Sequence, residues 1–494
     1  MALHLFRTKP VESIGESEAE AAGVGRLRKN LSARHLVGFG IGVVIGTGIF
    51  TLTGVEAKNH AGPAVVISFV IAGVVAVLAA LCYAELASSV PTAGSAYSYA
   101  FATAGELVAW IIGWDLFLEF ALGAAVVARG WSGYVGSLLH LPPSLFGEES
   151  TVNVGAVLIV VVLTVIAVLG IRESARVTGG LVIVKVVICV FVIVLGAWYL
   201  TGANLTPFVP QGEATHGEGG LAQPLIGAVF GLSPAAFGIG GILTAAAVVF
   251  FSYTGFEAVA NLSEETKRPG RDLPLGLLGT LAVSTALYVG VSFVVVGMVK
   301  YTKIDEGAPI ANAFDQNELG WASALVSLAA VAGLTSVILV DLVTVSRIGF
   351  AMGRDGLLPP MIAKVSERTG TPVRMTLAYA VVVVVMAAFV KLTTLADLVS
   401  IGTLFAFVLV SIAVPVLRRT KPDLDRKFRV PWSPVVPVLS ALACLYLMLN
   451  LSVETWLRFL AWMVIGLVFY FSYGHRHSRM RAEVQAEEKV RAGA

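Results

Sequence analysis

The sequence predicts an all-α polytopic membrane protein with about twelve transmembrane helices. Of its 494 residues, 57% are hydrophobic and only 13% are charged, and the mean hydropathy is +0.85. A helix that crosses the hydrocarbon core of a bilayer needs roughly 20 apolar residues. About twelve such stretches begin near residues 36, 64, 107, 153, 177, 239, 276, 321, 376, 396, 433 and 455. These stretches are continuous and do not alternate apolar with polar residues, which argues against a transmembrane barrel.

Lys and Arg residues gather in every second loop. The basic segments are the N-terminal tail, the loops after the fourth, sixth, eighth and tenth stretches, and the C-terminal tail, whereas the loops 136–152 and 201–238 contain no Lys or Arg. Cytoplasmic loops carry the excess of positive charge. We therefore expect a multi-pass protein of the cell membrane with both termini in the cytoplasm.

Several other classes of function lack their sequence signals. The net charge is only +2 and is dispersed among the loops, so no nucleic-acid partner is expected. The three cysteines are scattered inside apolar stretches, and all seven histidines lie outside them, so we expect no disulfide, metal or other cofactor and no catalytic centre. A nucleotide-binding loop and a channel-type polar filter are also missing from the sequence.

Two apolar stretches are interrupted by small and polar residues. The first, Gly38–Phe50, contains five glycines and Thr47, and the second, Val248–Leu262, contains the sequence Ser-Tyr-Thr-Gly at 252–255. Non-helical backbone at membrane depth is tolerated where it faces protein or a polar cavity. Interrupted helices at corresponding places in two repeats mark the binding site of many transporters. Close helix packing on small residues is the simpler alternative for either stretch alone.

Because the breaks are five stretches apart, the second unit is inverted relative to the first. This interpretation divides the chain as follows: 1–33, cytoplasmic N-terminal tail; 34–201, first five-helix repeat; 202–238, extracellular loop; 239–420, second five-helix repeat; 421–474, transmembrane helices 11 and 12; 475–494, cytoplasmic C-terminal tail.

Six sequence motifs carry a resemblance to a known family. They are IGTGIF (45–50), PTAGSAYSY (91–99), VARGWSGYV (127–135), FSYTGFEAVANLSEETKRPGRDLP (251–274), AMGRDGLLP (351–359) and SIGTLFAFVLVS (400–411). The chain resembles the amino acid–polyamine–organocation (APC) superfamily and, within it, the cationic amino acid transporter family. The resemblance implies the leucine-transporter fold, with ten core helices in a 5+5 inverted repeat, and secondary active import of amino acids.

The chemistry of an amino acid suits two unwound helices. Freed N–H groups and the positive end of a helix dipole complement a carboxylate, and freed carbonyls complement an ammonium. We assign the carboxylate to Thr47 and Gly48, and the ammonium to the carbonyls of Val44, Phe251 and Thr254, as the family pattern also implies. The remaining predicted substrate-binding residues are Gly46, Ser252 and Gly255 at the breaks and the acidic Glu119 and Asp341.

Ionisable residues inside membrane spans are costly and usually functional. Lys185 lies about ten residues into the fifth stretch, too far from its end for the side chain to reach the membrane surface. The resemblance places it against the unwound part of the first stretch, so we expect Lys185 to couple transport to protons by donating to carbonyls around Gly42 and Val43. The alternative is a permanently charged structural lysine.

Acidic and aromatic residues are assigned to selectivity and gating. The resemblance matches Glu119 to an acidic residue of the family and places Asp341 at the side-chain pocket, where both suit a cationic substrate. The alternatives are that Glu119 holds a proton and that Asp341, six residues before Arg347, lies near the cytoplasmic surface. Phe251 is expected to cover the substrate, with its neighbour Phe250 as the alternative. Glu257, Tyr83 and Glu85 are expected at the inner gate, with a solvated helix end as the alternative for Tyr83 and Glu85.

Several points stay open at this stage. The sequence does not decide between cationic and small neutral substrates, or between proton symport and amino acid exchange. A transporter-like amino acid sensor is a further alternative. Stoichiometry, oligomeric state and a small membrane subunit as partner are equally undetermined.

Overall fold

The computed structural model describes residues 30–89, 95–148, 150–169, 175–214, 220–231, 235–263, 265–363, 366 and 371–481. Most of both predicted tails, the first four residues of the PTAGSAYSY motif and the loop 170–174 lie outside these residues. The expectations for those segments therefore stay predictions.

The fold class predicted from the sequence is confirmed. Within the described residues, eight helical segments are long and apolar enough to cross a membrane, and four shorter apolar helices, Ala33–Val44, Val154–Val168, Val373–Phe389 and Val435–Leu449, fall in predicted stretches. The first five stretches form α3 (Ala33–Val44) with α4 (Thr53–Glu56), α5 (Val65–Ser89), α7 (Glu106–Leu139), α9 (Val154–Val168) and α10 (Ala175–Gly196). The next five form α12 (Gly238–Val249), α13 (Pro269–Met298), α15 (Gly320–Arg354), α17 (Val373–Phe389) and α18 (Leu392–Thr420), and α19 (Val435–Leu449) and α20 (Val453–Phe469) follow.

Short π- and 3₁₀-helical pieces extend or join these helices. They are η1 (Gly48–Leu52), η2 (Ala57–Ala61), η3 (Gly62–Ala64), η4 (Ala197–Tyr199), η5 (Gly202–Leu205), η6 (Gly220–Ala222), η7 (Phe250–Tyr253), η8 (Phe256–Leu262), η9 (Tyr301–Lys303) and η10 (Tyr470–Gly474).

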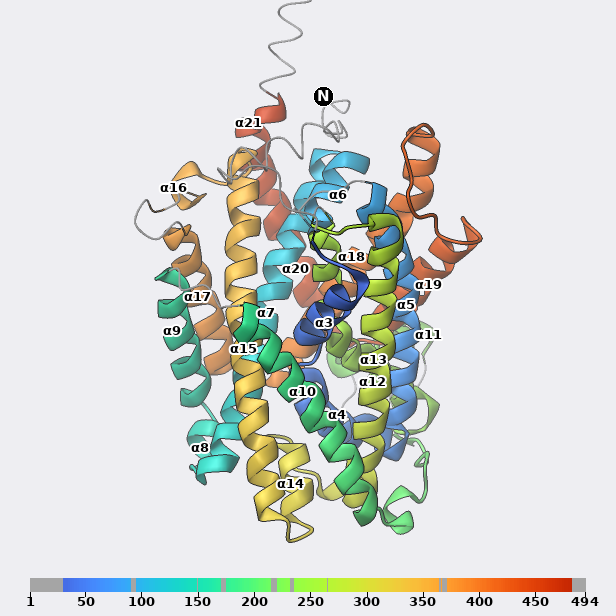
Figure 1. Cartoon of the computed structure of the whole chain (residues 1–494), viewed down its shortest axis with the longest axis vertical. Coiled ribbons are helices and arrows are strands. Elements are labelled where there is room, and N and C mark those ends of the chain that lie inside the picture. The colour runs from blue at the N-terminus through green and yellow to red at the C-terminus, as the bar shows by residue number, and fades with distance from the viewer. Residues whose placement is uncertain are drawn as a thin grey trace, which may run out of the picture.

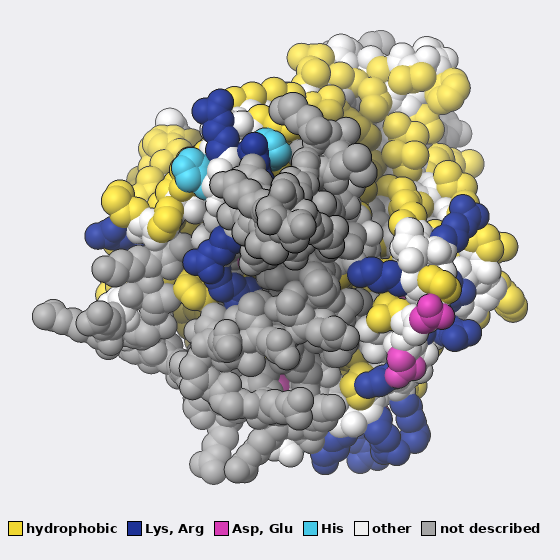
Figure 2. Space-filling view, turned by 90° about the horizontal axis from the view of Figure 1, so that it is seen from above, with side chains coloured by type: hydrophobic (Ala, Val, Ile, Leu, Met, Phe, Trp, Pro, Cys, Tyr) yellow, Lys and Arg dark blue, Asp and Glu magenta, His cyan; other side chains and the backbone are white. Residues whose placement is uncertain are grey.

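The two ends of the bundle carry different elements (Figure 1). One end holds α6 (Ser95–Thr103), α16 (Pro360–Ala363) and α21 (His475–His477). Lys and Arg side chains are prominent on this end in Figure 2, and we call it the basic end. The opposite end holds α8 (Pro143–Phe146) and α14 (Pro309–Asp315). The chain also contains α11 (Leu225–Phe230) and a two-stranded antiparallel pair, β1 (Glu213–Ala214) with β2 (Ala235–Ala236).

Helix α7 lies inside the bundle and α9, α10, α17 and α19 lie at its edge. Most of α7 is buried, and it packs against α15 and α18, while α3 and α5 pack against α13. By contrast, Val161, Val187, Val381 and Leu442 on the four edge helices expose apolar side chains. Because such a surface is unfavourable in water, we infer that these helices face lipid, and so does α20, which exposes Leu460, Val464 and Val468.

Both interrupted stretches lose their helical geometry at the residues that the sequence indicates. In the first, Ile45 adopts extended backbone (φ −74°, ψ 99°) after α3, and the chain resumes as η1. In the second, Thr254 is extended (φ −61°, ψ 149°), and Gly255 has a φ of +97°, which favours glycine. The two breaks leave backbone groups at helix ends without intrahelical partners.

Candidate substrate site

The two helix breaks are held together by a tyrosine. The hydroxyl of Tyr288, on α13, lies 2.7 Å from the carbonyl oxygen of Val44 and 2.8 Å from that of Ser252. It therefore contacts the first break and the second break at once. Sequence reasoning missed Tyr288, because a single tyrosine in an apolar helix gives no signal of the carbonyls that it will meet.

Glycine lets the breaks approach closely. A Cβ atom built on Gly48 would lie 2.2 Å from Ser252 Oγ and 2.5 Å from Ser252 Cα, which no side chain tolerates. A Cβ on Gly255 would lie 2.7 Å from Val43 Cγ1. These two glycines are therefore needed for contact between the breaks as well as for their local backbone.

A cavity of about 600 Å³ lies where the breaks meet. This volume suits a small molecule. Thirteen of the sixteen predicted site residues line it: Val43, Val44, Gly46, Thr47, Gly48, Tyr83, Glu119, Phe251, Ser252, Thr254, Gly255, Glu257 and Asp341. The other three, Gly42, Glu85 and Lys185, lie outside its lining.

Unpaired hydroxyls line the cavity beside the breaks. Thr47 Oγ1 and Ser252 Oγ are buried and have no hydrogen-bond partner among the described residues. The first N–H groups of the half-helix that starts after Thr47 also lack intrahelical acceptors. This region is therefore equipped to bind a carboxylate.

The predicted ammonium site is more fully occupied than we expected. The Phe251 carbonyl accepts hydrogen bonds from both the N–H (3.1 Å) and the hydroxyl (2.9 Å) of Thr254, and the Val44 carbonyl accepts from Tyr288. An ammonium at this place has to share or displace these donors. Helix periodicity in the sequence does not predict these hydrogen bonds at the breaks.

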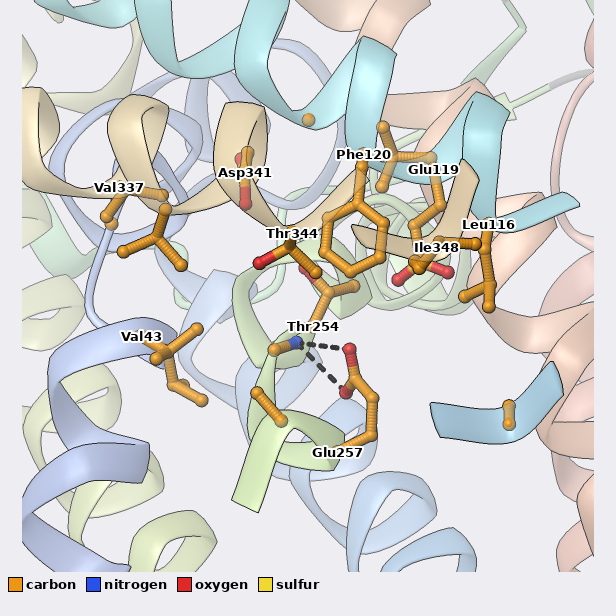
Figure 3. A pocket seen from close by; sticks show the side chains of 18 of the residues that line it. Val43, Leu116, Glu119, Phe120, Thr254, Glu257, Val337, Asp341, Thr344 and Ile348 are labelled. Atoms are coloured by element: carbon orange, nitrogen blue, oxygen red, sulfur yellow. Dashed lines mark hydrogen bonds between the residues drawn. The ribbon is translucent and has the colours of Figure 1, made fainter. Parts of the chain in front are cut away.

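Three carboxylates from three elements project toward the cavity (Figure 3). Glu119 comes from α7, Asp341 from α15 and Glu257 from η8. Glu257 interacts electrostatically with both other acids, and its two carboxylate oxygens accept hydrogen bonds from the Gly255 N–H at 3.0 Å. Among the described lining residues the only basic one is Arg354, so the cavity favours positive charge.

Asp341 and Phe251 both had alternative interpretations, and the structure distinguishes them. Asp341 is buried in the middle of α15 and lines the cavity instead of lying at the membrane surface. Phe251 lines the cavity, whereas Phe250 is fully buried and packs edge-on against Phe407 at 5.8 Å. Of the two phenylalanines, Phe251 is therefore the one that faces the cavity.

The predicted gating residues separate into two groups. Tyr83 lines the cavity and packs against Phe256 and Phe407. Glu85 does not reach the cavity, because its carboxylate accepts hydrogen bonds from the guanidinium of Arg418 at 2.6 and 2.8 Å. Glu85 thus joins α5 to α18 at the basic end.

Lys185 lies beside the first break, outside the main cavity. Its Nζ atom donates a 2.8 Å hydrogen bond to the carbonyl of Gly42, and the residue is only 1% exposed. A small hollow of about 30 Å³ next to it is lined by Gly42, Val43 and Val337 among others. Since Val43 and Val337 also line the main cavity, Lys185 is separated from it by a single layer of side chains.

The cavity extends toward the basic end. Ala96 and Tyr97 of α6, Glu265 and Arg354 line this part of it. Further lining residues that sequence reasoning missed are Leu116, Phe120, Gly123 and Val127 on α7 and Val337, Val340, Thr344 and Ile348 on α15. Helical spacing was the available signal, because these positions share the helix faces of Glu119 and Asp341.

Comparison with known proteins decides the family. The family model described as amino acid permease matches residues 31–470. The chain belongs to the amino acid permease family. It is 41% identical to the methylthioribose transporter of Bacillus subtilis (strain 168) over 484 residues, covering 96% of this chain and 98% of the relative. It is also 41% identical to the branched-chain amino acid permease BcaP of the same organism over 491 residues, covering 96% and 99%. Cationic amino acid transporter 4, vacuolar, of Arabidopsis thaliana is 39% identical over 429 residues, covering 85% of this chain and 68% of the relative.

This membership confirms the resemblance that the motifs indicated and identifies a multi-pass membrane transporter. The relatives' names describe permeases and transporters, and none names an enzyme. In this amino acid permease, the cavity between the helix breaks is the candidate substrate site.

Proposed function

We propose that this permease is a secondary active transporter that imports an amino acid by proton symport, with the substrate held between the breaks of the first and sixth spans. The observation that carries the proposal is the cavity of about 600 Å³ lined by both breaks. The free hydroxyls of Thr47 and Ser252 and the adjacent helix N-terminus suit the substrate carboxylate. Phe251 covers the bound molecule.

The proposed proton carrier is Lys185. When protonated, it holds the carbonyl of Gly42 and fixes the end of α3 beside the substrate; when neutral, it releases this charge-assisted bond. Loss of the proton on one side of the membrane therefore loosens the first break and links proton release to substrate release.

The proposed orientation places the basic end in the cytoplasm of a cell membrane, as the distribution of Lys and Arg indicates. The cavity then opens inward, since its lining continues to α6 and Arg354. An inward-open cavity is the state that delivers an imported substrate.

Two observations bear on the substrate class, and they favour different substrates. The acidic lining of Glu119, Asp341 and Glu257 favours an amino acid with a cationic side chain. The relatives named for branched-chain amino acids and for methylthioribose match a larger share of their own length than the cationic amino acid transporters do. We therefore include these three substrate classes in the test, with alanine as a small neutral amino acid.

The test is uptake into proteoliposomes that contain the purified protein. Labelled arginine, isoleucine, alanine and methylthioribose are compared with and without an inward proton gradient and without sodium. Accumulation that follows the proton gradient supports symport. Uptake that depends on internal amino acid and ignores the gradient supports an exchanger, and binding without any uptake supports a sensor.

A further inference from the structure

The connector between α18 and α19, residues 421–434, is fixed by buried polar contacts. The carboxylate of Glu85 accepts hydrogen bonds from the side chain of Arg418 and, at 2.7 Å, from the backbone N–H of Val430. The guanidinium of Arg426 donates to three backbone carbonyls of the connector and to that of Leu417 in α18, at 2.7–3.1 Å. These contacts fix the backbone of the connector without using its exposed side chains. Those side chains can therefore bind a ligand.

Six exposed cations lie on this connector or beside it. We call them the basic patch: Arg419, Lys427, Arg429, Lys267, Arg268 and Arg271. The two segments that carry them are in contact, since a Cβ on Gly270 would lie 2.6 Å from the carbonyl oxygen of Lys427. None of the ion pairs between described residues includes any of the six. Asp423 and Asp425, also exposed on the connector, leave an excess of positive charge.

Apolar side chains beside the basic patch place it at the membrane surface. Trp432 is 82% exposed, and the helix that follows presents Val435, Leu439 and Leu442 outward. Exposed tryptophan is typical of the level of the lipid headgroups, and apolar residues next to it face the acyl chains. Figure 1 shows the connector at the edge of the bundle, beyond the end of α18.

We propose that the basic patch binds the headgroup of an anionic phospholipid, with Trp432 in the interface beside it. Clusters of four to eight Lys and Arg residues next to a transmembrane helix attract anionic lipids. A phosphate group accepts several charge-assisted hydrogen bonds from such a cluster. The apolar neighbours explain why the ligand is a lipid in the bilayer and not a soluble phosphate.

The site is linked to the mouth of the cavity. The ammonium of Lys421, on the connector, donates a 3.0 Å hydrogen bond to the carbonyl of Ala102 in α6. Ala96 and Tyr97 of the same helix line the cavity at the basic end. A bound lipid therefore steadies the connector against an element that borders the substrate pathway.

The experiment measures lipid binding directly, so it does not depend on the proposed transport function. The purified protein in neutral detergent is titrated with phosphatidylglycerol or phosphatidylcholine, and bound lipid is counted by native mass spectrometry. The patch variant is Arg419→Gln/Lys427→Gln/Arg429→Gln. The matched control is Lys300→Gln/Lys303→Gln/Lys391→Gln, which removes three exposed cations from the opposite end of the bundle. We expect the patch variant to lose phosphatidylglycerol affinity by at least roughly tenfold while the control keeps it.

Three results overturn the proposal. They are equal phosphatidylglycerol binding by wild type and patch variant, an equal loss in the control variant, and displacement of the lipid by soluble glycerol 3-phosphate. If the patch variant does not fold, Lys267→Gln/Arg268→Gln/Arg271→Gln tests the other half of the patch, and Trp432→Ala tests the interfacial contact. Both are expected to weaken phosphatidylglycerol binding without changing phosphatidylcholine binding.

Discussion

The ammonium of Lys185 on α10 donates a 2.8 Å hydrogen bond to the carbonyl oxygen of Gly42, in the last turn of α3 before the first helix break. The two residues are 143 positions apart in the chain. Because the bond has a charged donor, its strength depends on the protonation of Lys185. It connects a titratable group to the backbone of the candidate substrate site.

The first prediction concerns this pair. Lys185→Ala should abolish the dependence of uptake on an inward proton gradient, because the proposed proton carrier is gone. Lys185→Arg should keep substrate binding but block turnover, since a guanidinium does not release its proton at physiological pH. Uptake by the variants is measured across external pH in proteoliposomes. A fully active Lys185→Ala protein whose uptake still follows pH contradicts the coupling role.

The second prediction concerns selectivity. Asp341→Asn should lower uptake of arginine more than uptake of alanine, by roughly tenfold in the ratio, because one buried charge pair is worth on the order of 1.4 kcal/mol or more. The measurement compares kcat/KM for the two labelled substrates. An equal effect on both would remove Asp341 from the selectivity site. Glu119→Gln gives the same test on α7, which packs against α15.

The third prediction uses two glycines of the first span. Gly48→Ala should abolish uptake, because the new methyl group would lie 2.2 Å from Ser252 Oγ and force the breaks apart. Gly38→Ala is the matched control, since a Cβ there meets no atom within 4 Å. Wild-type uptake by Gly48→Ala, or equal loss in both variants, would show that close contact between the breaks is not required.

The fourth prediction concerns Tyr288. Tyr288→Phe removes the hydroxyl that lies between the Val44 and Ser252 carbonyls. It should raise KM by roughly fivefold to tenfold, because one such hydrogen bond contributes about 1 to 1.5 kcal/mol. Tyr379→Phe is the control, because the Tyr379 hydroxyl is buried without a partner among the described residues. A KM unchanged in Tyr288→Phe would mean that the two breaks keep their geometry without this contact.

The fifth prediction concerns stability at the end opposite the basic end. The buried guanidinium of Arg129 donates to Glu148 at 2.9 Å, and Glu148 also accepts from the N–H of Leu392 at the start of α18. Glu148→Gln should cost about 3–5 kcal/mol, because it leaves a buried cation without its counter-charge.

An exposed ion pair provides the control for this prediction. Glu454→Gln breaks the pair of Glu454 with Arg458, whose side chains are 45% and 42% exposed, and should cost less than about 1 kcal/mol. The comparison is made on the thermal unfolding midpoints of the purified proteins. Equal midpoints for the two variants would show that the Arg129–Glu148 pair does not stabilise the fold.

The membrane spans and the positions of the breaks could be read from the sequence with good accuracy. A bilayer requires continuous apolar helices, so composition along the chain marks them without knowledge of the fold. The Gly-Thr-Gly at 46–48 and the Ser-Tyr-Thr-Gly at 252–255 stood out for the same reason. Polar residues at membrane depth need a structural cause.

The contacts of each side chain could not be predicted from the sequence. Asp115 and Glu119 are four residues apart on α7, yet Glu119 lines the cavity, whereas Asp115 is fully buried outside it with both oxygens unpaired among the described residues. The gating role predicted for Glu85 has to act through Arg418 and the connector, since Glu85 does not contact the cavity. The rotation of each helix about its axis decides these contacts.

The sequence by itself determined the fold class, the family and the two places where helices come apart, because hydrophobic length and backbone chemistry are local properties of the chain. Only the tertiary structure decided that Tyr288 meets both breaks, that Phe251 rather than Phe250 faces the cavity, and that Lys185 reaches Gly42. Such contacts join residues far apart in the chain, and they depend on how helices pack against one another, which no local pattern specifies.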